Sequence, residues 1–124
     1  MFIKDLRLLL DETSASIQTL NRICREQQGD WRQEVVRMRR RVSDEMSRIS
    51  VLVASCNEPS PSLIAFRNAL SKLRSAVAHL QASWPAVSLD PDNLSYRDSV
   101  KHVRIELEAL AAALVLCEQD GSGR

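Results

Sequence analysis

Only two histidines are present in this chain, His79 and His102, and they are its best candidates for moving a proton or a phosphoryl group. An imidazole titrates near neutral pH and can therefore act as a general acid or base. Both histidines lie two residues past an apolar position of their segments, so we expect both to face solvent. Zinc is usually held by three or four protein ligands, and two histidines alone therefore predict neither a metal site nor a cofactor. The chain also lacks a glycine-rich phosphate loop and a His-Glu-x-x-His segment.

The segment around the second histidine has the spacing of a nuclease motif. Residues 97–102 read RDSVKH and resemble the Arg-polar-x-x-x-His motif of HEPN ribonucleases, which are all-helical, usually dimeric bundles. The resemblance implies that His102 assists proton transfer, that Arg97 stabilises charge on the scissile phosphate, and that Asp98 helps to position them. The alternative is that these are ordinary surface residues.

The first histidine lies in a different context. Residues 78–83 read AHLQAS and resemble histidine phosphotransfer domains, which are four-helix bundles with an exposed histidine in mid-helix. The resemblance implies that His79 carries a phosphoryl group. In that family a lysine and a glycine follow the histidine closely, whereas Gln81, Ala82 and Ser83 stand there in this chain. An ordinary surface histidine is the alternative.

Three cysteines are spread along the chain: Cys24, Cys56 and Cys117. Their odd number and wide spacing argue against a disulfide framework and against a zinc knuckle. All three fall on expected core positions, where a free cysteine packs as a small apolar side chain. Trp31, Trp84 and Tyr96 fall on apolar positions at expected helix ends, where we expect them to close the core.

The elements that must position these residues are four long helices. Apolar residues recur at steps of three and four along segments near 3–28, 31–57, 61–84 and 91–117, which is the pattern of helices that pack side by side. In the second segment the expected buried positions are Trp31, Val35, Met38, Val42, Met46, Ile49, Val53 and Cys56.

The links between these segments carry helix stop and start signals. Gly29 is expected to end the first helix, and Asp30 to cap the second. Ser60 with Pro61, and Asp90 with Pro91, have the N-cap and N1 residue types of the third and fourth helices.

Short links make sequence neighbours antiparallel. The sequence therefore predicts an all-α fold, a single antiparallel up-down-up-down four-helix bundle over residues 1–120, with 121–124 as a flexible tail. No segment approaches membrane-spanning length and no signal peptide is recognisable, so we expect a cytoplasmic protein without membrane contact.

Two helix ends are more apolar than one buried stripe requires. In an up-down bundle the start of the first helix lies beside the end of the fourth, so both surpluses should meet at one end. A contiguous apolar patch indicates a surface for self-association or for a protein partner. The residues expected in this surface are Phe2, Leu8, Leu9, Ala112, Val115 and Leu116. Thicker local packing is the alternative.

Charge is also unevenly distributed. The second and third helices carry an expected basic face, made of Arg37, Arg40, Arg41, Arg48, Arg67 and Arg74, while acid is concentrated on the fourth. The formal net charge is only +1, unlike that of a typical nucleic-acid binder. A solvated face and an acidic protein partner are therefore favoured over nucleic acid.

Taken together, these features favour a small non-enzymatic interaction or adaptor module that acts through protein–protein contacts, with a homo-oligomer as the first expectation. The HEPN-type ribonuclease that uses Arg97 and His102 is the first alternative, and the phosphotransfer domain that uses His79 is the second.

Overall fold

The computed structural model describes residues 2–57 and 59–120, which form four α-helices joined by short links. The elements are α1 (Phe2–Glu26), α2 (Trp31–Ala54), α3 (Pro61–Ser83), the short 3₁₀ helix η1 (Ala86–Ser88) and α4 (Leu94–Asp120). The described residues contain no strand, and the predicted all-α antiparallel four-helix bundle is confirmed. None of the described helices is long and apolar enough to cross a membrane. The expected tail, 121–124, lies outside the described residues.

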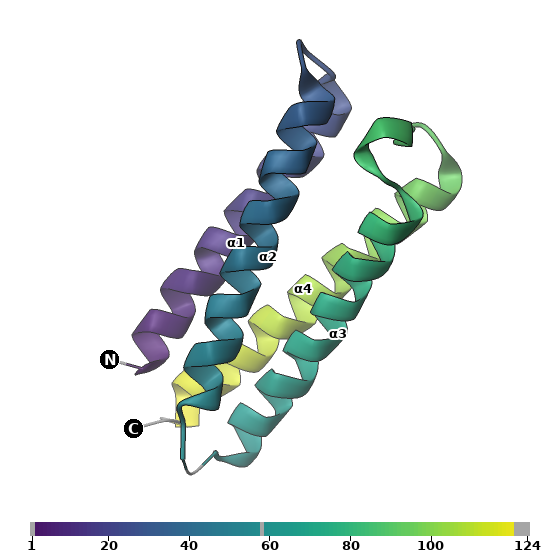
Figure 1. The fold of residues 1–124 in the computed structure, drawn as a ribbon. Coiled ribbons are helices and arrows are strands. Elements are labelled where there is room, and N and C mark those ends of the chain that lie inside the picture. The colour runs from purple at the N-terminus through teal and green to yellow at the C-terminus, as the bar shows by residue number, and fades with distance from the viewer. Residues whose placement is uncertain (1, 58, 121–124) are drawn as a thin grey trace.

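The helices pair as two antiparallel hairpins, α1–α2 and α3–α4. Contacts within each hairpin are far more extensive than contacts between the hairpins. Figure 1 shows the hairpins side by side, close together at the end that holds the chain termini and diverging toward the other end. The bundle is therefore two layers of two helices rather than four equally spaced helices.

Arginine side chains bridge the two hairpins. At the end with the termini, Arg7 on α1 holds the carboxylate of Glu118 on α4 through two hydrogen bonds, Nε–Oε2 at 3.0 Å and Nη2–Oε1 at 2.6 Å. Between α2 and α3, Nη1 of Arg74 donates to Oγ of Ser50 at 2.7 Å. The first contact places the start of α1 beside the end of α4, as the up-down topology requires.

A further bridge closes the diverging end. Nη1 of Arg32, near the start of α2, donates to the carbonyl oxygens of Ala86 at 2.7 Å and Leu89 at 3.0 Å, both in the link before α4. The guanidinium also lies over the Trp31 ring, 4.3 Å from its centroid. Backbone carbonyls are strong acceptors, so these bonds fix the link against α2.

Buried side chains from all four helices form one core. The largest of those almost completely buried are Leu6, Ile49, Leu63, Phe66, Leu73, Leu89, Leu110 and Leu114. Cys24 and Cys117 are buried, as expected, whereas Cys56 is only partly buried. The expected closing aromatics are in place at one end, where the Trp84 ring packs edge-on against Tyr96 at 5.8 Å between centroids.

The capping residues predicted the start of α3 correctly and the start of α4 incorrectly. Ser60 caps α3 as predicted, because its side chain accepts a hydrogen bond from the backbone nitrogen of Leu63. The predicted start of the fourth helix at Asp90 and Pro91 is wrong. Asn93 caps α4 instead, and its Oδ1 accepts from the backbone nitrogen atoms of the next helical turn.

The end of α1 also differs from the prediction. The helix ends at Glu26, and Gln27 takes the left-handed conformation with φ of 50°, a place usually given to glycine. Gly29, the expected terminator, has φ of 56° but lies farther along the link. Asp30 does occupy the N-cap position of α2, although its side chain makes no capping hydrogen bond.

The buried stripe of α2 is shifted at one position. Arg39 is buried, whereas Met38, the expected core residue, is only partly buried. Steps of four and three that start at Val35 and end at Val53 pass through position 39, so the helix geometry overrides the hydrophobicity of the two side chains. This correction places a charged residue in the interior.

The bridge at the termini gives a test of how the hairpins are held together. The hydrogen bonds from Arg7 lower the pKa of Glu118, so the ionised carboxylate stabilises the fold at neutral pH and loses this effect as pH falls through the lowered pKa. We expect Glu118→Gln to reduce the free energy of unfolding at pH 7 by about 1 kcal/mol or less, since solvent screens a partly exposed pair. Urea unfolding at several pH values should show the difference from wild type shrinking in acid.

The matched control is Glu108→Gln, because the Glu108 carboxylate lies near Arg104 of the same helix and joins no second helix. If Glu108→Gln and Glu118→Gln were equally destabilising at neutral pH, the bridge would have no special role in joining the hairpins.

Candidate functional site

The apolar residues predicted at the two helix ends lie at the same end of the molecule. Leu8 on α1 and Leu116 on α4 both point outward, with 59% and 54% of their surface exposed. Ala112 and Val115 are exposed as well. The surplus on α4 is therefore a true surface feature.

The start of α1 divides between core and surface. Phe2 and Leu9 are partly buried and pack against the core. Leu8 and Leu9 also line a shallow groove, named here the α1–α2 groove, whose residues are Asp5, Leu8, Leu9, Glu12, Arg48, Val51, Leu52 and Ser55. All of these belong to α1 and α2 or to the residue that follows α2, so the exposed apolar residues of α4 lie outside the groove.

Val51 is the exposed aliphatic residue of the groove that the sequence pattern did not indicate. It is 72% exposed and lies next to the partly buried Leu52. A large aliphatic residue between buried positions of a helix is easily read as ordinary scatter. Only the pairing of α1 with α2 brings Val51 to the same groove as Leu8.

The groove has opposite charges on its two sides. Asp5 and Glu12 lie on the α1 side, and Arg48 lies on the α2 side. The exposed aliphatic residues of the groove, named here the aliphatic strip, are Leu8 on α1 and Val51 on α2. A groove with acid on one helix and base on the other can dock against a surface with the reverse arrangement.

Several arginines of the expected basic face form ion pairs or hydrogen bonds with neighbouring side chains. Arg37 lies 3.2 Å from Glu34, and Arg41 lies 3.7 Å from the buried Glu45. Arg74 is the side chain that bridges to α2. Arg40, Arg48 and Arg67 are exposed. These neighbours reduce the local positive charge that a nucleic-acid backbone would need.

The two histidines lie at the same surface hollow, between α3 and α4. His79 on α3 and His102 on α4 are exposed and line one shallow hollow together with Lys72 and Glu106. Nε2 of His102 lies 3.5 Å from Oε1 of Glu106. Within the described part of the chain no three His, Cys, Asp or Glu residues are grouped so that they could hold a metal ion.

The two ends of the nuclease-like segment point in different directions. Arg97 turns back toward the link before α4, where its Nη2 lies 3.4 Å from Asp92 and its Nε lies 3.4 Å from the carbonyl oxygen of Pro91. Residues 97 and 102 are about 140° apart around the helix axis. Asp98 is exposed beside Arg97. The nuclease and phosphotransfer functions both stay predictions.

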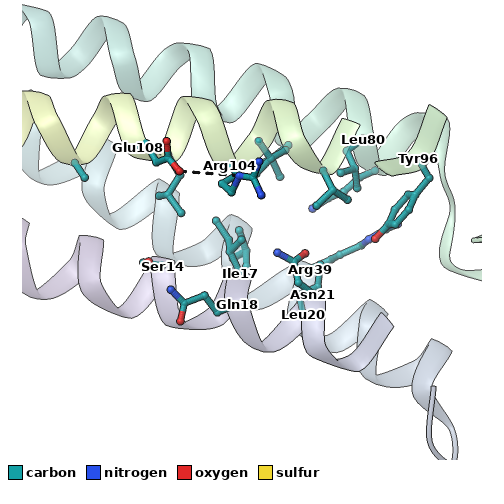
Figure 2. A pocket seen from close by; sticks show the side chains of 17 residues that line it. Ser14, Ile17, Gln18, Leu20, Asn21, Arg39, Leu80, Tyr96, Arg104 and Glu108 are labelled. Carbon is teal, nitrogen blue, oxygen red and sulfur yellow. Dashed lines mark ion pairs between the residues drawn. The ribbon is translucent and has the colours of Figure 1, made fainter. Parts of the chain in front are cut away.

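A cavity of about 340 Å³ lies between the two hairpins. Its lining comes from all four helices: Ser14, Ile17, Gln18, Leu20, Asn21, Arg39, Val42, Val77, Leu80, Gln81, Tyr96, Val100, Val103, Arg104, Leu107, Glu108 and Ala111. Figure 2 shows the cavity running along the helices, with Arg39 and Tyr96 at one end and Ser14 and Glu108 at the other. Most of the wall is aliphatic.

The cavity explains why three aliphatic residues on the inner faces of their helices are not fully buried. Leu20, Val100 and Leu107 continue the steps of three and four that connect the buried residues of α1 and α4, yet each is only partly buried. All three line the cavity. Close packing stops where the hairpins separate, so these side chains keep part of their surface exposed to the cavity.

Arg39 extends from α2 into this cavity and is only 9% exposed. Its Nε and Nη2 atoms are buried and have no hydrogen-bond partner among the described residues. Glu108, the acidic residue of the lining, lies near Arg104 and about 18 Å along α4 from Tyr96. A buried guanidinium without a carboxylate is costly to fold, because arginine stays charged in proteins.

The ionisable groups closest to Arg39 do not balance its charge. The Tyr96 hydroxyl donates a hydrogen bond to Sγ of Cys24 at 3.5 Å. Burial raises the pKa of the Cys24 thiol and the pKa of the Tyr96 phenol, so both are neutral at pH 7. Burial also lowers the pKa of Arg39, which expresses the same cost of desolvation.

Comparison of the chain with known protein families, characterised proteins and solved structures finds no match. Its function therefore has to be argued from the groove, the histidine hollow and the cavity described above.

The desolvated guanidinium predicts an unusual stability effect. Replacing Arg39 by methionine keeps much of the side-chain volume and removes the buried charge, so Arg39→Met should raise the free energy of unfolding by about 1–3 kcal/mol. The matched control is Arg40→Met, because Arg40 is exposed on the same helix and its replacement should change little. Urea unfolding followed by circular dichroism measures both. A destabilised Arg39→Met protein would show that Arg39 has a stabilising partner.

Proposed function

We propose that this chain is a non-enzymatic interaction module that associates with a second copy of itself through the α1–α2 groove. The observation that carries the proposal is a groove with two exposed aliphatic residues, Leu8 and Val51, and with acidic residues on α1 and a basic residue on α2. Aliphatic surface of this kind is stabilised when it is removed from water.

A twofold axis parallel to the helices and lying in the interface makes the groove complementary to itself. Such an axis places α1 of one copy over α2 of the second. Leu8 then faces Val51 of the second copy, and Arg48 faces the acidic side that carries Asp5 and Glu12. Every contact occurs twice, so modest pairwise energies double.

The size of the strip indicates a weak complex. Burying a leucine or a valine contributes about 1.5 kcal/mol or more. Association costs at least about 4 kcal/mol in lost rigid-body freedom. Leu8 and Val51 are partly buried already, so their burial in two copies contributes about as much as that minimum cost. We therefore expect a weak, reversible and concentration-dependent dimer rather than an obligate one.

Breaking the aliphatic strip tests the proposal. Leu8→Glu/Val51→Glu places two charges in the apolar contact and should shift the protein fully to monomer, because a carboxylate buried there would have to be desolvated. Sedimentation equilibrium over a wide concentration range measures the shift. Val87→Glu is the control, since Val87 on η1 is 84% exposed, lies outside the groove and should leave the dimer unchanged.

Exchanging the charges tests the orientation. Glu12→Arg alone should weaken the dimer, and Glu12→Arg combined with Arg48→Glu should restore it, since the opposite charges then face each other again. A wild-type protein that is monomeric at millimolar concentration, or a groove variant that dimerises normally, would rule out self-association through this surface.

A further inference from the structure

The buried guanidinium of Arg39 presents one complete edge to the cavity. Nε and Nη2, the two atoms without partners among the described residues, carry roughly parallel N–H groups along one edge of the planar guanidinium. That edge is the one with which arginine grips both oxygens of a carboxylate. Arg7 uses the same two atoms to hold the carboxylate of Glu118 in this protein.

From this geometry we infer that the cavity between the hairpins binds a linear aliphatic carboxylate. The carboxylate head pairs with Arg39 at the end of the cavity that also holds Tyr96 and Asn21. An anion there compensates the guanidinium charge, which the neutral Cys24 thiol and Tyr96 phenol leave unbalanced. This inference is independent of self-association, since no residue of the α1–α2 groove lines the cavity.

The rest of the cavity matches a chain-like apolar tail. Beyond Arg39 the wall is built mainly from aliphatic side chains, among them Ile17, Val77, Val103 and Leu107. On α4 the lining runs from Tyr96 to Ala111, which is about 22 Å along the helix axis. A volume of about 340 Å³ spread over that length has room for a single chain but not for a wide ring system.

The size and composition are those of a ligand site. Pockets for small molecules typically enclose about 300–1,000 Å³, have mostly apolar walls and orient their ligand with a few polar groups. Here the volume lies at the lower end of that range. Arg39 is the polar group that fixes the head, and the polar residues at the opposite end, Ser14 and Glu108, lie beside the tail.

Calorimetric titration of the full chain tests the inference with four probes. Decanoate carries both the charge and the tail, decan-1-ol carries the tail alone, decyltrimethylammonium reverses the charge, and acetate carries the head alone. We expect saturable one-to-one binding of decanoate, at least roughly tenfold weaker binding of decan-1-ol, and no measurable binding of decyltrimethylammonium or acetate. Decanoate should also raise the melting temperature, because it binds the folded state alone.

Variants of the protein test the contact with the carboxylate head separately from the contact with the apolar tail. Arg39→Met should weaken decanoate binding by roughly 10- to 100-fold, the loss expected for a charge-assisted hydrogen-bonded pair, while Arg40→Met should bind as wild type does. Val103→Trp fills the middle of the cavity and should abolish decanoate binding without touching Arg39. Circular dichroism confirms that each variant is folded.

Three results would overturn the inference. Absence of saturable decanoate binding at millimolar concentration would mean that water alone solvates the guanidinium. Equal affinity for decanoate and decan-1-ol, or unchanged decanoate binding by Arg39→Met, would exclude a carboxylate at Arg39. The oligomeric state of the wild type and of Leu8→Glu/Val51→Glu, measured separately, keeps this outcome distinct from that of the proposed function.

Discussion

Hydrogen bonds from arginine at the two ends of the bundle determine how its halves meet. Near the termini Arg7 holds Glu118 across α1 and α4, and at the other end Arg32 holds the carbonyl oxygens of the link before α4. From the end with the termini the hairpins diverge toward the other end, as Figure 1 shows, and the helices pack mainly against their hairpin partners. The cavity lies between the separated hairpins, and Arg39 extends into it.

That arrangement puts stability and recognition in conflict at one residue. A close-packed bundle would place an apolar side chain at position 39, since the position belongs to the buried stripe of α2. A charged residue there raises the free energy of the folded chain unless an anion is bound. In native proteins, destabilising residues of this kind are found mainly at functional sites, within a core that is otherwise consistently packed. The other buried side chains are mainly leucine, isoleucine, valine and phenylalanine, with Thr13, Ser16 and Glu45 as the polar exceptions.

Periodicity predicted the number, order and packing faces of the helices because those depend on local geometry alone. Along α3, steps of three and four from Leu63 to Leu80 pass through buried residues alone, as the apolar pattern of that segment indicates. The stripe of α2 was wrong at Met38, because hydrophobicity favoured it over Arg39 although steps of four and three pass through the arginine. A strict four-and-three spacing from Val35 identifies Arg39 as the buried residue. The cavity had no such signal, since the distance between hairpins depends on side chains that are far apart in sequence. The same holds for Val51 and Leu8, which line one groove only because α1 packs against α2.

The division into hairpins also bears on how the chain reaches its structure. Most close contacts join helices that are consecutive in sequence, so each hairpin can form from short-range interactions before the two halves meet. Chains rich in such local contacts fold quickly, because little loop entropy is lost before contacts are gained. Docking of two preformed halves is then the last step, and its reversal is the smallest opening that exposes the interior. Separation of the two hairpins therefore lets a ligand enter the interior while each hairpin stays folded.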